Sequence, residues 1–239
     1  MTTATRHVEY RHDELTFDGV LALADSKDEK RPTVLVFHGV EGRSDTQVEF
    51  AKSVTEWGYH GLAVDLFGQH ATAADSERYQ ELMTAFLNDR GTLRERLLHV
   101  FDVARSVPEV DSDRLAAIGF CFGGLCALDL ARTGAAVQGV ASFHGILTAP
   151  SGTTNDEITA KVISFHGWDD PFAPPEDVTA FGREFSERGA DWQVHAYGAT
   201  MHAFMAPWAD NPDAGIQYNK RSAQRAWASL KAFLDEALS

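Results

Sequence analysis

The stretch from Leu115 to Gly124, with the sequence LAAIGFCFGG, constrains the fold more than any other part of the chain. An apolar run leads into a glycine-flanked cysteine, Cys121, and a helix-forming segment follows from Leu125 to Arg132. This is the pattern of a nucleophile elbow, a sharp strand-to-helix turn, with cysteine in the place of serine. The residues two before and two after the nucleophile approach each other in such a turn and must be small, and Gly119 and Gly123 meet that need.

The positive end of the dipole of the following helix points at the Cys121 sulfur and favours the thiolate. The alternative is a buried, unreactive cysteine in a glycine-rich turn. The rest of the chain favours the reactive cysteine, because it supplies the partners that a nucleophile needs, in a suitable order.

Short apolar runs alternate with amphipathic segments along the chain. The runs predict strands at 33–37, 62–66, 140–143, 162–165 and 192–197, and the first of them has the near-continuous apolar character of a strand buried on both faces of a sheet. Helical spacing of apolar residues, with a capping box at Ser44 and Gln47 for the first, predicts helices at 44–57, 75–87, 91–107, 175–189 and near the C-terminus. The alternation predicts a single α/β domain over residues 1–239, with a doubly wound, mostly parallel sheet and helices on both faces. Residues 8–24, interrupted by Asp18-Gly19, predict an antiparallel hairpin at the edge of the sheet.

The composition excludes several classes of function. The formal net charge of −14 argues against binding to nucleic acid or to an anionic membrane surface. The N-terminus has no apolar core of a signal peptide, and two cysteines do not make a disulfide framework. We therefore expect a cytoplasmic monomer that acts on a small molecule. A metal site is not expected, because Cys121 and Cys126 have no second Cys/His pair at ligand spacing.

Two further predicted strands end in polar residues that suit a cysteine nucleophile. His166-Gly-Trp-Asp-Asp-Pro171 follows one strand, and Tyr197-Gly-Ala-Thr-Met-His-Ala-Phe204 follows the last strand. Nucleophile, acid and histidine in this order along the chain is the arrangement of α/β-hydrolases. The imidazole would take the thiol proton, and the carboxylate would hold the ring in the useful tautomer.

His202 is the candidate base, because it lies in the loop just beyond the last strand. Asp170, directly before a proline, is the candidate acid, whereas its neighbour Asp169 is more typical of a solvated or capping residue. His38, His144 and His166 each end a strand before a glycine and are candidate pocket-lining or structural residues. Five histidines in edge, loop or helix contexts are more typical of solvated side chains: His7, His12, His60, His70 and His99.

The segments 119–124, 166–171 and 197–204, together with 57–59 and 64–68, resemble the dienelactone hydrolase family over nearly the whole chain. The resemblance implies a cofactor-free α/β-hydrolase that opens a lactone or ester with Cys121, His202 and Asp170. It also implies an oxyanion hole formed by the backbone N–H groups of Phe122 and Val40.

The sequence departs from the family pattern in two places. The family often has a glutamate directly after the residue that matches His38, but Gly39 stands there and Glu41 follows two positions later. Glu41 either reaches the sulfur from its own position or is a surface residue. The arginine that follows the histidine in enzymes acting on carboxylated dienelactones is also replaced by apolar residues. Three other arginines are candidates to bind a substrate carboxylate, and spacing selects none of them: Arg43, Arg78 and Arg90.

Three functions follow from these features. The first is a cysteine-dependent hydrolase that opens an enol-lactone through an acyl-thioester. The second is a general carboxylesterase or thioesterase of the same fold without lactone specificity. The third is a catalytically weak protein in which Cys121 senses oxidants or binds a ligand.

Overall fold

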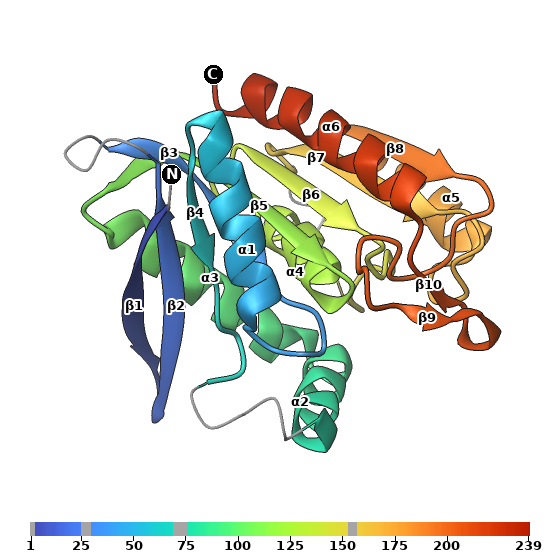
Figure 1. Cartoon of the computed structure of the whole chain (residues 1–239), viewed down its shortest axis with the longest axis horizontal. Helices are drawn as coiled ribbons and strands as arrows, with labels where there is room; N and C mark the ends of the chain where they lie inside the picture. Colours follow the sequence, from blue (N-terminus) through green and yellow to red (C-terminus); the bar gives the residue numbers. More distant parts are fainter. Residues whose placement is uncertain (1–2, 25–29, 69–75, 153–156) are drawn as a thin grey trace. The chain divides into compact units, whose positions relative to one another are not determined.

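The structure is a computed structural model that describes residues 3–24, 30–68, 76–152 and 157–239 (Figure 1). The chain divides into two compact units, Met1–Ala117 and Ile118–Ser239. Strand β5 (Val110–Phe120) carries the chain from the first unit into the second. The single domain expected from the sequence stays a prediction.

In the first unit, the strands follow the order β1-β2-β4-β3. Strands β1 and β2 pair antiparallel, as do β2 and β4, whereas β3 and β4 are parallel. The elements of this unit are β1 (Ala4–His12), β2 (Leu15–Leu23), β3 (Arg31–Phe37), α1 (Asp45–Ser53), a 3-10 turn (Val54–Trp57), β4 (His60–Ala63), α2 (Ser76–Asn88) and α3 (Arg90–Ser106).

The edge hairpin is confirmed, but its turn differs from the expected place. Asp13 and Glu14 form the turn, with Asp13 at φ 54°, and Asp18-Gly19 lies inside β2. Aspartate tolerates the left-handed conformation that a tight turn needs, and this local preference overrides the Asp-Gly signal further along.

The first helix begins as predicted, with Ser44 and Gln47 forming a capping box. It ends as an α-helix at Ser53, and the rest of the predicted segment is a 3-10 turn closed by Gly58 at φ 90°. Close packing explains Gly61 of β4, since a Cβ atom there would lie 2.1 Å from the carbonyl oxygen of Ala51 in α1.

In the second unit, β6 (Gly139–Phe143), β7 (Lys161–Gly167) and β8 (Asp191–Tyr197) pair parallel in that order. Its helices are α4 (Phe122–Arg132), α5 (Pro175–Glu187) and α6 (Lys220–Ala237). Two strands of two residues each, β9 (Asp210–Asn211) and β10 (Ile216–Gln217), pair antiparallel around a 3-10 turn at Pro212–Ala214. These short strands were not predicted, because two residues carry no periodicity.

Alternation along β6 places the helices of this unit on opposite faces of its strands. A Cβ atom at Gly139 would meet Phe233 and Ala237 of α6, whereas Ser142, an odd number of residues away, lies against Gly124 of α4. Successive side chains of a strand point to opposite faces, so α6 covers one face and α4 the other, as can be followed in Figure 1. The predicted α/β class, with a mostly parallel sheet and helices on both faces, is confirmed.

Among the helices of the described residues, none has the length and apolar character that crossing a bilayer requires.

Candidate active site

Cys121 occupies a strained turn between β5 and α4. Its backbone has φ 55° and ψ −117°, a conformation that costs a non-glycine residue about 1–3 kcal/mol. Hydrogen bonds on both sides hold it there: the Cys121 N–H donates to the Phe143 carbonyl (3.0 Å) and to His144 Nδ1 (3.2 Å). The Cys121 carbonyl accepts from the N–H groups of Gly124 (3.0 Å) and Leu125 (3.3 Å). Phe122 is the first residue of α4, so its backbone N–H lies at the helix N-terminus beside the cysteine.

Gly119 is required by the sharpness of this turn. A Cβ atom at this position would lie 1.9 Å from the carbonyl oxygen of Gly123. We expect Gly119→Ala to lower the free energy of unfolding by about 3 kcal/mol or more, because overpacking against rigid backbone forces the turn to open. Urea unfolding measures this, and Gly198→Ala is the matched control, since a Cβ atom at Gly198 meets nothing within 4 Å. Equal stability of the two variants would contradict the close approach.

Asp170 and His202 form the second part of the site. The Asp170 Oδ2 atom lies 2.8 Å from His202 Nδ1, and both side chains are buried. Asp169, in contrast, is exposed. Backbone bonds join the two loops: the Asp169 N–H donates to the Thr200 carbonyl (2.9 Å), and the Trp168 N–H donates to the Tyr197 carbonyl (2.9 Å). The structure thus brings Asp170, and not Asp169, to the imidazole.

The segment after His202 holds the backbone of this histidine. The His202 N–H donates to the Gly215 carbonyl (2.9 Å), and the Gln217 N–H donates to the His202 carbonyl (3.0 Å). These bonds tie the histidine to β10. The bonds of His202 with Gly215 and Gln217 were not predicted from the sequence. The only indication of them is that residues 211–219 are rich in residue types that favour turns.

Cys121 is the third member of this group. It is partly buried, and its interaction with His202 is one cause of the shifted pKa of the imidazole. Burial by itself lowers the pKa of His202, but the hydrogen bonds to Asp170 and Cys121, and the charges of both groups, raise that pKa to about 10. The Asp170 carboxylate occupies Nδ1, which leaves the other ring nitrogen for the sulfur. The structure therefore brings the thiol of Cys121, the imidazole of His202 and the carboxylate of Asp170 together within the second unit.

The raised pKa of His202 makes part of the stability depend on pH. Its folded-state value of about 10 lies above the ordinary value of 6.5, so the native state favours the imidazolium. This contribution is fully present below pH 6.5 and is lost as the pH rises through about 10. We expect the stability difference between the protein and His202→Gln to shrink steadily over this range, as measured by urea unfolding at a series of pH values. A difference that stays constant would contradict the raised pKa.

His144 contacts both Cys121 and His202. Its ring centroid is 5.0 Å from that of His202 and 5.4 Å from that of Phe204, and its backbone has φ 38°. Burial, together with the nearby His202, holds the pKa of His144 well below its usual range. A neutral ring that accepts the Cys121 N–H at Nδ1 carries its proton on Nε2.

The remaining predicted residues of the loop after β3 belong to the first unit. His38 is buried between the Gly39 carbonyl (2.7 Å from Nδ1) and the Leu66 N–H, which donates to Nε2 (3.1 Å). Burial lowers the pKa of His38. Glu41 accepts from Gln47 Nε2 (2.5 Å) and from the Gly39 N–H (3.3 Å). These bonds describe a structural role for His38, while roles of Glu41 and Val40 in catalysis stay predictions.

Two of the candidate arginines are paired with carboxylates. Arg43 lies 3.1 Å from Asp18, and the exposed Arg78 lies 3.1 Å from Glu81. Arg90 is the first residue of α3. No substrate carboxylate site follows from these positions.

The expectation that His60 is solvated is wrong. Its ring is fully buried, and its Nδ1 atom accepts the Ala24 N–H (3.1 Å), because β4 lies inside the sheet of the first unit. His166 is also buried, and its ring nitrogens have no hydrogen-bond partner among the described residues. His7 is exposed, and His70 lies outside the described residues.

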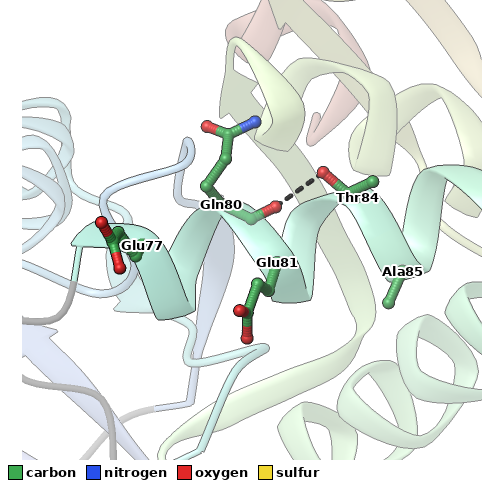
Figure 2. A pocket seen from close by; sticks show the side chains of 5 residues that line it. All are labelled: Glu77, Gln80, Glu81, Thr84 and Ala85. Carbon is green, nitrogen blue, oxygen red and sulfur yellow. Dashed lines mark hydrogen bonds between the residues drawn. The ribbon is translucent and has the colours of Figure 1, made fainter.

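A surface hollow on the exposed side of α2 is lined by none of the predicted site residues (Figure 2). In it, the Thr84 hydroxyl donates to the Gln80 carbonyl (2.7 Å), an ordinary bond within a helix. The lining residues are Glu77, Gln80, Glu81, Thr84 and Ala85. The hollow contains carboxylates but no cysteine or histidine. Across the described residues, no group of three or more His, Cys, Asp or Glu side chains is placed to hold a metal ion.

Comparison with known proteins shows the family of the chain. Residues 17–238 match the model of the dienelactone hydrolase family. A probable 2-oxo-3-(5-oxofuran-2-ylidene)propanoate lactonase from Bradyrhizobium sp is 25% identical over 214 residues, which cover 85% of this chain and 83% of the relative. Among solved structures, m3DLH has a TM-score of 0.92 and 34% identity, with 99% of each chain covered. A dienelactone hydrolase-like promiscuous phosphotriesterase from metagenomic libraries has a TM-score of 0.91 and 32% identity, with the same coverage.

The fold and the elbow thus define an α/β-hydrolase, an enzyme of the ester and lactone type. Within that class, the chain belongs to the dienelactone hydrolase family.

Proposed function

We propose that the protein hydrolyses a lactone or ester through an acyl-thioester on Cys121, with His202 as the general base and acid and Asp170 as the orienting carboxylate. The observation that carries this proposal is the Asp170–His202 bond of 2.8 Å beside a cysteine on a strained elbow. The 25% identical lactonase supports a lactone as substrate.

In the first half of the reaction, the Cys121 sulfur attacks the acyl carbon as a thiolate, and a tetrahedral oxyanion forms. The N–H of Phe122, at the start of α4, is the donor that we assign to this oxyanion. Loss of one such donor costs other enzymes roughly 3 kcal/mol of barrier. The oxyanion then collapses, His202 gives its proton to the leaving oxygen, and the acyl-thioester remains.

In the second half, neutral His202 takes a proton from water, and the resulting hydroxide attacks the thioester carbon. The C–S bond breaks, the thiolate leaves, and the acid product is released. The imidazolium formed here is stabilised by the released thiolate and by the Asp170 carboxylate, whose Oδ2 lies 2.8 Å from Nδ1. A thiolate leaves more readily than an alkoxide, so leaving groups that are weak bases suit this nucleophile: the enol of a lactone, a phenol or a thiol.

A second candidate activity is the cleavage of phosphotriesters. The neighbour at 32% identity is named for this promiscuous activity, and the same thiolate would attack phosphorus with loss of an aryloxide. Carboxylesterase or thioesterase activity without lactone specificity also uses the same site. A panel of an enol-lactone, aryl esters, a thioester and an aryl phosphotriester ranks these by kcat/KM.

We place this chemistry in the cytoplasm. A reducing compartment protects a thiol nucleophile such as Cys121 from oxidation, and the two cysteines of the chain do not make a disulfide framework.

Rapid mixing with p-nitrophenyl acetate tests the proposal. We expect a burst of nitrophenol equal to the enzyme concentration, followed by slower turnover, and a quenched sample with one acetyl group on Cys121 by peptide mass spectrometry. Acetylation of another residue during turnover, or turnover without any adduct on rapid quenching, would refute the acyl-thioester route. A protein that only senses oxidants shows no burst.

A further inference from the structure

We infer that, for ester substrates, the side chain of Phe172 selects the leaving group and favours a neutral aromatic alcohol, an inference that deepens and rests on the function proposed above. Phe172 is 49% exposed, yet its ring lies against the base: the ring centroids of Phe172 and His202 are 4.9 Å apart with planes at 64°. A large apolar side chain in this position borders both the reacting imidazole and the solvent.

The backbone of Phe172 is held by Asp170, the residue that we propose orients His202. Asp170 uses Oδ2 for His202 and Oδ1 to accept the Phe172 N–H at 2.8 Å. The intervening Pro171 packs against Gly215, where a Cβ atom would lie 2.4 Å from the Pro171 Cγ. The turn is therefore fixed on both sides, so Phe172 has a defined place next to the imidazole.

The chemistry assigns Phe172 to the leaving group. The acyl part of the substrate becomes attached to Cys121, whereas the departing oxygen must take its proton from His202. A ring that touches His202 and faces solvent thus lies on the side where the alcohol departs. After the alcohol has left, only the acyl group remains on Cys121, so Phe172 affects the acylation step and not the deacylation step.

The neighbourhood favours an uncharged aromatic group. The residues after His202 are apolar (Ala203-Phe204-Met205-Ala206), and Phe204 and Met205 are buried. A net charge of −14 repels anionic substrates. Aromatic rings pack against a phenylalanine edge or face more favourably than alkyl groups of the same size. We therefore expect discrimination between aryl and alkyl alcohols rather than between acyl groups.

Two acetate esters of matched leaving-group acidity, one aryl and one fluoroalkyl, test this inference, because they form the same acetyl-enzyme. In Phe172→Ala, we expect the acylation rate constant to fall about tenfold for the aryl ester and about twofold or less for the fluoroalkyl ester. The rate of deacetylation should be unchanged. Phe172→Leu keeps apolar bulk and should give an intermediate aryl loss.

Trp168→Ala is the matched control. Trp168 lies in the same loop, is 45% exposed, and places its ring against His166 at 6.3 Å. Its variant should keep the aryl preference. Equal losses on both esters in Phe172→Ala, or a selective aryl loss in Trp168→Ala, would overturn the inference. Neither result contradicts the acyl-thioester proposal. That proposal is contradicted if Cys121 of the unmodified protein is not acylated during the burst.

Discussion

Cys121→Ala is expected to lower kcat/KM for an enol-lactone or aryl ester by roughly 10⁴-fold or more. The reason is that alanine removes the atom that forms the acyl bond, while the helix N-terminus and the substrate contacts remain. The small activity left over should show no burst and no acetyl adduct. Steady-state assays at high enzyme concentration measure the residual rate.

Cys126→Ala is the control for this experiment. Cys126 is the other thiol of the chain, lies five residues further along in α4 and is completely buried, so its loss changes packing but no reacting group. We expect its burst amplitude to match that of the unmodified protein. Full activity in Cys121→Ala, or an equal loss in both variants, would end the proposed mechanism.

Asp170→Asn has the second-largest expected effect, a loss of kcat of about 10³- to 10⁴-fold. The amide is nearly the same size as the carboxylate, but its NH₂ group donates to Nδ1 and favours the tautomer with the proton on the other ring nitrogen. The ring then cannot take a proton from the thiol or from water. We also expect the raised pKa of His202 to fall, because the Asp170 hydrogen bond is a main cause of that rise. NMR titration of the His202 ring measures it.

Asp169→Asn separates this role from a general effect on the loop. Asp169 is exposed, and only its backbone N–H, which the substitution retains, bonds to Thr200. We expect near-normal kcat. A loss in Asp169→Asn as large as that in Asp170→Asn would contradict the assignment of the acid.

The parts of the fold that follow strong local rules were predictable from the sequence. Strands such as Lys161–Gly167 are buried on both faces and contain a short apolar run, and the capping box at Ser44 uses local hydrogen bonds. The elbow was predictable because the approach of Gly119 to the Gly123 backbone permits only glycine. The choice of His202 and Asp170 rested on chain order, which requires no knowledge of distances.

The rest depends on contacts between residues far apart in the chain. The support that β10 gives to the backbone of His202, and the place of His144 against the Cys121 N–H, arise from packing and leave no periodic trace. The burial of His60 was mispredicted for the same reason, since its short strand has one polar residue at the start and the neighbours that cover it lie elsewhere in the sequence. The exposure of Phe172 has no signature in sequence at all, because most phenylalanines are buried.

One feature of the turn after Asp170 bears on how such an enzyme diversifies. The backbone N–H of Phe172 donates to Asp170 Oδ1, whereas the Phe172 side chain is half exposed and lies beside His202. The two tasks are carried by chemically independent parts of one residue. A substitution at position 172 can therefore change which leaving group the protein prefers. The backbone N–H at this position still bonds to Asp170, so the geometry of Asp170 and His202 is retained.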